Sequence, residues 1–405
     1  MHLVLAKIPD AQGKLPPSTK GISLFFVPKH LPPVADAFPE RNDVVLAGLN
    51  HKMGFRGTTN CLLNFGDGRH RPGGADGAVG WLVGKQGEGL RCMFHMMNEA
   101  RVGVGLGAVM LGYTGYLHSL DYARHRPQGR PPQGKNPATP QVTIVQHSDV
   151  RRMLLAQKSY VEGGLALVLF CSRLLDDVNT APSQAERDDA QTLLELLTLI
   201  AKSWPSQRCL AANDLAIQVH GGYGYTRDYN VEQYYRDNRL NPIHEGTHGI
   251  QGLDLLGRKV RMDNGRSLEL LQGRVAAALA RASESPRENL DELRAWGVQL
   301  MEQLDAIKVT LARLYSLSDL DLTLANASVF LEAFGYVVVA WIWLEQALVA
   351  ANGTRQASSE EADFYAGKHQ AARYFFRWEL PKVAPMLTLL DSADDTTLRM
   401  RDEWF

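Results

Sequence analysis

Two histidines that flank a glutamate form the most conspicuous chemical string of the sequence, at His244, Glu245 and His248. On one face of a helix, this H-E-x-x-H spacing lets both imidazoles bind Zn²⁺ while the glutamate acts as a general base. A zinc hydrolase that uses His244 and His248 is therefore one hypothesis. Pro242 argues against it, because a proline two residues before His244 would leave that histidine in or before the first helical turn.

The same glutamate supports a different chemistry. Glu245 is followed by Gly246 and Thr247, a sequence typical of a helix start, where backbone N–H groups point outward without partners. Gly246 lets another molecule approach the backbone closely. A carboxylate beside exposed amides can remove a proton while an amide polarises the neighbouring carbonyl group of a substrate. The alternative is an ordinary first-turn acid that the helix dipole favours, and the residues alone leave both interpretations open.

Two glycine-rich strings need separate explanations. Residues 102–107 alternate valine or leucine with glycine, as a dinucleotide-binding loop does, but no predicted strand precedes them. Their small residues fit close contact between two helices better. Residues 221–224, Gly-Gly-Tyr-Gly, indicate by themselves no more than a tight turn.

Arginines mark two further positions. Arg101 begins a long apolar helix, where a guanidinium usually has an anionic or carbonyl partner. Arg124, Arg126 and Arg130 surround a loop rich in proline and glycine over residues 127–140. They could bind phosphates, or they could form a solvated basic loop.

Composition excludes several classes of protein. The chain has 405 residues, with 43 lysines and arginines against 44 aspartates and glutamates, so its formal net charge is −1 and predicts no nucleic-acid partner. Four scattered cysteines without a CxxC pair exclude a disulfide scaffold and a zinc ribbon. The longest apolar runs, residues 102–117 and 334–344, are shorter than the roughly 18–20 residues of a membrane span. With no recognisable secretory signal, we expect a soluble, cytoplasmic protein.

Hydrophobic periodicity predicts strands first and helices afterwards. Strands are expected near residues 3–8, 22–27, 43–46 and 61–65. Long helices are expected over residues 90–126, 148–176, 184–219 and 245–261, the third with a kink at Pro205. After a linker at residues 262–265, four amphipathic stretches near 268–283, 289–316, 320–351 and 360–388 predict a second small bundle.

Taken in order, five segments resemble the acyl-CoA dehydrogenase family. Two lie in the strand region, a third ends the first long helix, a fourth follows the third long helix, and the last contains Glu245. The segments are residues 21–28, 51–58, 122–130, 218–225 and 243–247. The C-terminal stretches are similar to the extra domain of larger bacterial members, including 3-methylmercaptopropionyl-CoA dehydrogenases.

The resemblance implies a reaction. Glu245 would be the base that takes the α-proton of an acyl-CoA thioester, giving a trans-2-enoyl-CoA, with FAD as cofactor. Some family members carry the base immediately before Arg101, but Ala100 stands there, so this chain fits the Glu245 type. We assign substrate binding to Arg101 and Gly246.

The resemblance also implies where FAD binds and which partners to expect. An electron-transfer flavoprotein would accept the electrons. The protein would be a homodimer or homotetramer in which Arg126 and Gln128 contact the FAD of the neighbouring subunit. The cofactor-binding positions that match the family are Arg126, Gln128, Gln218, Gly221, Gly222 and Thr247.

These observations predict an α+β, mainly α fold in three parts. Residues 1–82 would be a partial β domain, residues 83–262 the family's C-terminal helical bundle, and residues 267–395 an additional helical domain. The family's N-terminal helical domain and the first part of its β domain are expected before residue 1. A truncated, non-catalytic homologue that acts as an interaction subunit is therefore the main alternative to an enzyme.

Overall fold

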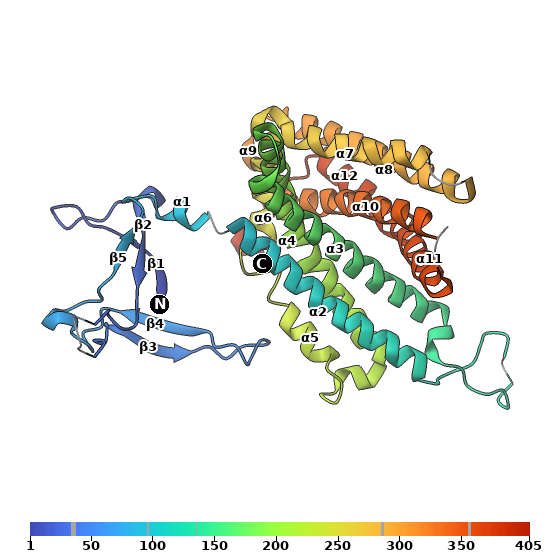
Figure 1. Cartoon of the computed structure of the whole chain (residues 1–405), viewed down its shortest axis with the longest axis horizontal. Coiled ribbons are helices and arrows are strands. Elements are labelled where there is room, and N and C mark those ends of the chain that lie inside the picture. The colour runs from blue at the N-terminus through green and yellow to red at the C-terminus, as the bar shows by residue number, and fades with distance from the viewer. Residues whose placement is uncertain (34–37, 95–96, 135, 285–286, 355–357) are drawn as a thin grey trace. The chain divides into compact units, whose positions relative to one another are not determined.

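The structure is a computed structural model that describes the chain except residues 34–37, 95–96, 135, 285–286 and 355–357 (Figure 1). The chain folds into two compact units, Met1–Ala100 and Arg101–Phe405. Strands occur in the first unit and long helices make up the second, which confirms a mainly α fold with a small β part.

The first unit is built from short antiparallel strands. β2 (Ile22–Val27) lies between β1 (His2–Lys7) and β5 (Trp81–Val83), and β3 (Val44–Leu49) pairs with β4 (Cys61–Phe65). The sequence predicts all of these except β5, which has only 3 residues and therefore shows no alternating pattern.

The helix predicted over residues 90–126 is described in two parts, and residues 95–96 between them lie outside the described ranges. α1 (Gly89–Phe94) packs on β2 in the first unit, where a Cβ on Gly89 would lie 2.4 Å from the Ser23 carbonyl carbon. α2 (Met97–His125) instead runs along the helices of the second unit. Both described parts of the predicted helix are helical, and the stretch that would join them lies outside the described residues.

The second unit begins with three long helices, α2, α3 (Ser148–Thr180) and α4 (Gln184–His220). α2 and α4 run parallel, since Gly105, Gly112 and Gly115 approach Ala201, Cys209 and Asn213 in that order. A Cβ on Gly105 would lie 2.1 Å from the Ala201 carbonyl oxygen, so only glycine permits this approach. Gly103 and Gly107 of the same string have no atom within 4 Å of a Cβ position. The close helix contact that the glycine string predicts therefore belongs to Gly105.

Pro205 lies inside α4, which continues through it to His220. A proline has no N–H, so the carbonyl of Ala201 lacks its usual helical donor. That carbonyl is the one that Gly105 approaches. Gly105 of α2 therefore contacts α4 at the carbonyl group that lacks a helical hydrogen bond.

The segment after α4 contains a second correction. α5 (Val231–Asn238) follows a 3₁₀ turn at Gly221–Tyr225, and α6 spans His248–Gly257, whereas the sequence predicts a helix over residues 245–261. α6 begins later because Thr247 is its N-cap and the two residues before it have positive φ. It ends earlier because a 3₁₀ segment, Lys259–Gly265, follows.

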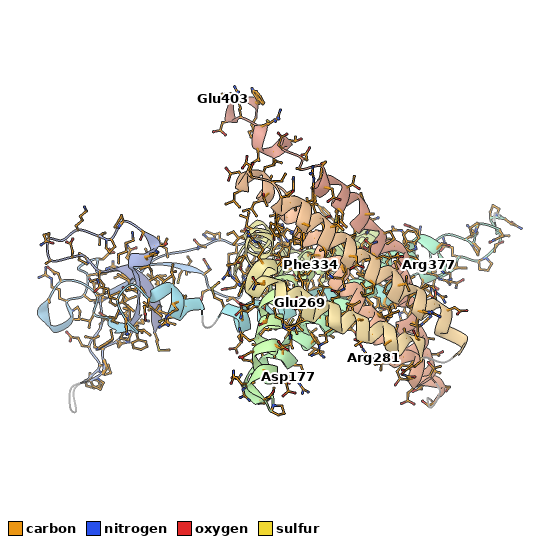
Figure 2. The ribbon with its side chains drawn as sticks, turned by 90° about the horizontal axis from the view of Figure 1, so that it is seen from above. Asp177, Glu269, Arg281, Phe334, Arg377 and Glu403 are labelled. Atoms are coloured by element: carbon orange, nitrogen blue, oxygen red, sulfur yellow. The ribbon has the colours of Figure 1, made fainter. Side chains whose placement is uncertain are left out.

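The C-terminal stretches are divided more finely than the four predicted helices. Asn326 separates α9 from α10, and a π-helical turn at Phe375–Glu379 followed by Pro381 interrupts the last predicted helix. Phe334 of α10 is buried, whereas Glu269, Arg281 and Arg377 lie on the outside (Figure 2). The helices are α7 (Arg266–Ser283), α8 (Arg287–Tyr315), α9 (Leu320–Leu324), α10 (Ala327–Gly353), α11 (Ser359–Tyr374), α12 (Val383–Asp391) and α13 (Thr396–Arg399).

By length and composition alone, α3 and α10 could cross a membrane. In the structure 67% of the apolar window of α3 and 83% of that of α10 are buried among other helices, as in core helices of a bundle. The apolar run predicted at residues 334–344 underestimates the length of the buried helix, because α10 continues past the glutamates on both sides of that run. Glu332 pairs with Arg208 and Glu345 pairs with Arg281, so neither acid ends the buried helix.

Candidate active site

Glu245 lies in a tight turn immediately before α6. Its φ is 53° and that of Gly246 is 91°, so two consecutive residues adopt positive φ, which is uncommon for a residue other than glycine. Thr247 closes the turn as the N-cap of α6, where its hydroxyl accepts a hydrogen bond from the Ile250 amide. The side chain of Glu245 is exposed. The carboxylate therefore stands on a backbone kink ahead of the helix, and the prediction that it lies in the first helical turn is wrong.

Two side chains hold the carbonyl groups of this turn. Lys202 of α4 donates from Nζ to the Gly246 oxygen at 2.6 Å, and Gln251 of α6 donates from Nε2 to the Glu245 oxygen at 2.9 Å. In a planar trans peptide, the N–H points away from the carbonyl of the same unit. The amides of Gly246 and Thr247 therefore point away from Lys202 and Gln251, and no residue that the structure describes accepts a hydrogen bond from either.

Cationic groups surround this turn. Lys202 is fully buried, and its burial lowers its pKa to about 8, helped by Arg101 and opposed by Glu245. Burial also lowers the pKa of Arg101, which the carboxylates of Asp254 and Glu245 oppose. The Nε of Arg101 is buried, and no described residue accepts its hydrogen bond. The site thus combines one exposed carboxylate, outward amides and two partly desolvated cations.

The zinc hypothesis requires a geometry that this segment lacks. His244 precedes α6 and His248 is its first residue, so the two imidazoles do not stand one turn apart on one helix. Within the described ranges, no group of three or more histidine, cysteine or acidic side chains could hold a metal ion. His248 is largely buried instead, and burial, followed by the charges of Lys202 and Arg208, lowers its pKa to about 4.

The lowered pKa of His248 predicts that acid destabilises the protein. An unfolded histidine has a pKa of 6.5, so the native state binds this proton less readily, and stability is fully present above pH 6.5 and lost as the pH falls toward 4. His220 and His244 have pKa values lowered in the same direction, also chiefly by burial. We expect a loss of about 2 kcal/mol through His248 between pH 6.5 and 4.5.

Urea unfolding across this pH range measures the effect. In His248→Gln, which stays neutral, the decline in unfolding free energy should be shallower than in the unmodified chain. Identical declines in the two proteins would contradict a role for His248.

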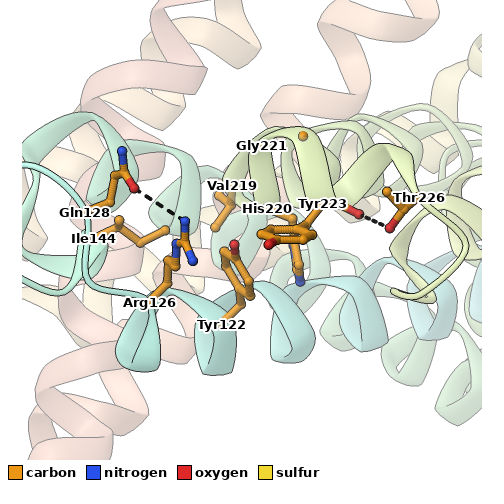
Figure 3. Close-up of a pocket in the computed structure, with 10 residues that line it drawn as sticks. Tyr122, Arg126, Gln128, Ile144, Val219, His220, Gly221, Tyr223 and Thr226 are labelled. Atoms are coloured by element: carbon orange, nitrogen blue, oxygen red, sulfur yellow. Dashed lines mark hydrogen bonds between the residues drawn. The ribbon is translucent and has the colours of Figure 1, made fainter.

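A pocket of about 590 Å³ lies where α2 and α4 reach their C-terminal ends (Figure 3). It is within the usual size range of small-molecule and cofactor sites. Four of the six predicted FAD positions line it. The complete lining is Tyr122, Arg126, Gln128, Ile144, Val219, His220, Gly221, Gly222, Tyr223 and Thr226.

Arg126 is the charged group of this pocket. It makes no ion pair with any described residue; its guanidinium lies 5.7 Å from the centre of the Tyr223 ring and 3.4 Å from the Gln128 side-chain oxygen. Nearby, the rings of Tyr122 and His220 stack with centroids 4.3 Å apart. A guanidinium without a carboxylate partner beside flat rings suits a ligand that carries both phosphate and an aromatic base.

The two glycines of the pocket have different reasons to be glycine. Gly221 has φ 61° and ψ −139°, a conformation that side chains with a Cβ rarely adopt, and it ends α4. Gly222 has no atom within 4 Å of a Cβ position, so its backbone is open to a ligand. Together they turn the chain sharply and leave main-chain groups at the pocket wall.

The helices keep the two sites apart within one chain. Lys202 and His220 are separated by about 27 Å along α4, at 1.5 Å per residue. Thr247 lies at the Glu245 turn and not at the pocket, and Gln218 is exposed beside the pocket without lining it. Arg130 donates to loop carbonyls of Thr139 and Pro137, which makes it a loop-stabilising residue. The predicted FAD residues therefore lie in two places, Thr247 beside the middle of α4 and the others at or beside the pocket where α2 and α4 end.

Sequence analysis missed several residues at both sites. Lys202 gave one usable signal, because a lysine between Ala201 and Trp204 interrupts an otherwise apolar stretch of α4. Tyr122 and Gln251 stand in segments that resemble the family, residues 122–130 and 250–251, but the sequence does not show that Tyr122 stacks on His220 or that Gln251 holds the Glu245 carbonyl.

Two family models match the helical part of the chain. Residues 87–260 match the model of the acyl-CoA dehydrogenase C-terminal domain, and residues 271–401 match the acetyl-CoA dehydrogenase C-terminal-like model. Between them they include the Glu245 turn, the pocket and the C-terminal helices.

Curated relatives agree with these matches. The 3-methylmercaptopropionyl-CoA dehydrogenase of Ruegeria pomeroyi is 40% identical over 68% of this chain and 44% of its own length. The broad-specificity linear acyl-CoA dehydrogenase FadE5 of Mycobacterium tuberculosis is 33% identical over the whole chain and 66% of its own length. A butyryl-CoA dehydrogenase of Syntrophomonas wolfei is 29% identical over the whole chain and 64% of its own length. The chain thus spans between 44% and 66% of these relatives.

Solved structures show the same fold at low sequence identity. The crystal structure of Caenorhabditis elegans ACDH-11 in complex with C11-CoA covers the whole chain with a TM-score of 0.74 and 18% identity, over 58% of that protein. An acyl-CoA dehydrogenase of Bacillus anthracis complexed with FAD covers 96% of the chain and 67% of its own chain, with a TM-score of 0.50 and 19% identity. FAD is accordingly the cofactor that the family relationship supports. The chain belongs to the acyl-CoA dehydrogenase family.

Proposed function

We propose that this chain carries the catalytic base and part of the cofactor site of an FAD-dependent acyl-CoA dehydrogenase, which converts an acyl-CoA thioester into a trans-2-enoyl-CoA. The observation that carries the proposal is the Glu245 turn. It presents an exposed carboxylate beside two backbone amides that donate to no residue the structure describes, as removal of a proton next to a carbonyl group requires.

In this proposal, Glu245 takes the proton from the carbon next to the thioester carbonyl. The α-proton is acidic enough only if the carbonyl oxygen receives hydrogen bonds as negative charge develops on it, which backbone amides of the turn would supply. Gly246 gives the turn its positive φ, and Arg101 adds positive charge near the carboxylate. FAD, when bound, would accept the hydride that leaves the β-carbon.

The pocket at Arg126 fits the phosphate and adenine parts of such a cofactor. A guanidinium that pairs with no described carboxylate, an open glycine backbone and stacked rings are the groups that phosphate and adenine require. Arg126 directly follows α2 and lies about 38 Å from Arg101 at 1.5 Å per residue, so we propose that it serves the FAD of a neighbouring subunit in a homodimer or homotetramer.

Arg126→Ala tests the pocket. We expect FAD affinity to fall roughly 10- to 100-fold, the effect of losing a charge-assisted phosphate contact of about 1.5–3 kcal/mol. Arg124→Ala is the matched control, because Arg124 is exposed two residues away and does not line the pocket. Equilibrium dialysis of FAD against both variants measures the difference. Equal affinity in the two variants would exclude Arg126 from cofactor binding.

The relatives suggest the substrate class and the surroundings. We propose a short or medium acyl-CoA, with 3-methylmercaptopropionyl-CoA as one candidate, an electron-transfer flavoprotein as acceptor and a cytoplasmic location. The direct experiment measures flavin bound per chain and acyl-CoA-dependent reduction of a dye by the flavin-loaded protein. Flavin binding with dye reduction supports the enzyme. A folded chain without either would favour the interaction subunit.

A further inference from the structure

Lys202 is a fully buried lysine near the middle of α4, and the reaction proposed above gives it no chemical step. Its ammonium group has one hydrogen-bond acceptor among the described residues, the carbonyl oxygen of Gly246 at 2.6 Å. The charged or titratable groups around it are Arg101 from α2, His248 at the start of α6, and His244 and Glu245 from the turn. Most of these are cationic or neutral, so Lys202 is not held by a close ion pair.

This arrangement is unfavourable for stability. Burial lowers the pKa of Lys202 to about 8, so the native state resists the charge that the unfolded lysine carries, and holding the ammonium destabilises the fold below that pH. A methionine of similar length would fill the space without this penalty. A buried charge that weakens the fold and contacts the backbone of a proposed catalytic turn indicates a role at that site.

The backbone of the turn shows what that role is. Lys202 draws the Gly246 carbonyl toward α4, while Gln251 draws the Glu245 carbonyl toward α6. Each carbonyl fixes its peptide plane, and each plane carries the amide of the next residue on its opposite edge. Positive φ at both Glu245 and Gly246 lets two successive planes be held this way, and a Cβ on Gly246 would lie only 2.3 Å from Gln251 Nε2.

We propose that Lys202, together with Gln251, is a positioning residue for the Glu245 site: it holds the turn so that the amides of Gly246 and Thr247 stay directed away from the bundle core. The inference rests on the proposed function for its catalytic meaning, but the orientation of the turn is independent of any cofactor. It assigns Lys202 no contact with substrate.

The variant Lys202→Met removes the donor and the charge while keeping the side-chain length. We expect kcat for dye reduction to fall roughly 10- to 100-fold with the acyl-CoA KM within about twofold, because the misdirected amides act on developing charge. The melting temperature should be unchanged or higher. Lys259→Met is the matched control, since Lys259 is also buried but pairs with Glu195 at 2.6 Å; it should lower the melting temperature and leave kcat unchanged.

Hydrogen exchange gives a readout that needs neither flavin nor turnover. The amides of His248 and Gln251 donate to Pro242 and Thr247 carbonyls when the turn is formed. In Lys202→Met their exchange should accelerate at least tenfold, while the amides of α4 remain protected. Gln251→Met, which removes no charge, should accelerate exchange of the His248 amide in the same way and lower kcat.

Three outcomes overturn the proposal: exchange in Lys202→Met within twofold of the unmodified chain, kcat within twofold, or a fall in kcat that merely accompanies a loss of stability like that of Lys259→Met. If the unmodified chain itself binds no flavin and reduces no dye, the proposed function fails. The exchange experiment still decides whether Lys202 holds the turn.

Discussion

Glu245→Gln is expected to abolish acyl-CoA-dependent flavin reduction while leaving flavin binding intact. Glutamine has nearly the same shape but cannot accept the α-proton, and loss of a general base typically lowers a rate by about 10²–10⁴. The turn should keep its form, because the backbone of residue 245 is held through its carbonyl by Gln251 and not through its side chain. Stopped-flow measurement of flavin absorbance after mixing with acyl-CoA gives the rate directly.

Glu269→Gln is the control for this experiment. Glu269 is an exposed acid of α7 that does not border either candidate site, and its substitution removes the same charge from the chain. Its flavin reduction rate should equal that of the unmodified protein. If Glu245→Gln keeps more than a few per cent of the rate, the base lies elsewhere and the central assignment is lost.

Gly105→Ala should destabilise the second unit severely. Its Cβ would be 2.1 Å from the Ala201 carbonyl oxygen and 3.0 Å from the carbonyl carbon, so α2 and α4 would have to move apart. Forcing atoms into a close backbone contact costs roughly 1–3 kcal/mol or more. Because Arg101 lies one turn before Gly105 and Lys202 directly follows Ala201, we also expect weaker flavin reduction. Urea unfolding monitored by helical circular dichroism measures the loss of stability.

Gly107→Ala provides a control two residues along the same helix. No atom lies within 4 Å of its Cβ position, and it is exposed on α2. Alanine in a helix interior is favoured over glycine by about 0.8–1 kcal/mol, so this variant should be slightly more stable than the unmodified chain. A similar change in both variants would show that helix propensity, and not the α2–α4 contact, governs the first result.

The sequence predicts the elements well where each is decided locally. The long helices α3 and α4 begin at the predicted residues, 148 and 184, because apolar residues recur at helical spacing. Ser183 and Glu186 also form a capping box at the start of α4. Short-range chemistry also explains Gly221, which forms a sharp turn at the end of α4. It likewise explains Arg126 and Gln128, which lie in the loop that follows α2. Ordered motifs along the chain were enough to identify the family, since each is a local string.

Local sequence patterns do not predict a helix boundary correctly where a side chain from a distant segment determines the backbone conformation. The helix expected to begin at Glu245 starts at His248, because Lys202, 43 positions earlier in the sequence, and Gln251 hold a turn with positive φ that no propensity favours. The two described parts of the helix predicted over residues 90–126 pack on different partners, α1 on β2 and α2 on α4, which periodicity does not show.

The amino-acid sequence by itself determined the family, the order of the elements and the identity of the candidate base. Only the tertiary structure decided which predicted residues share a site: Arg126, Gln128, Gly221 and Gly222 meet where α2 and α4 end, whereas Thr247 and Glu245 lie in the turn beside the middle of α4. It also revealed the buried lysine behind the Glu245 turn. The reason is physical, because periodicity records which face of a helix is apolar but not which neighbour covers that face or what a buried charge contacts there.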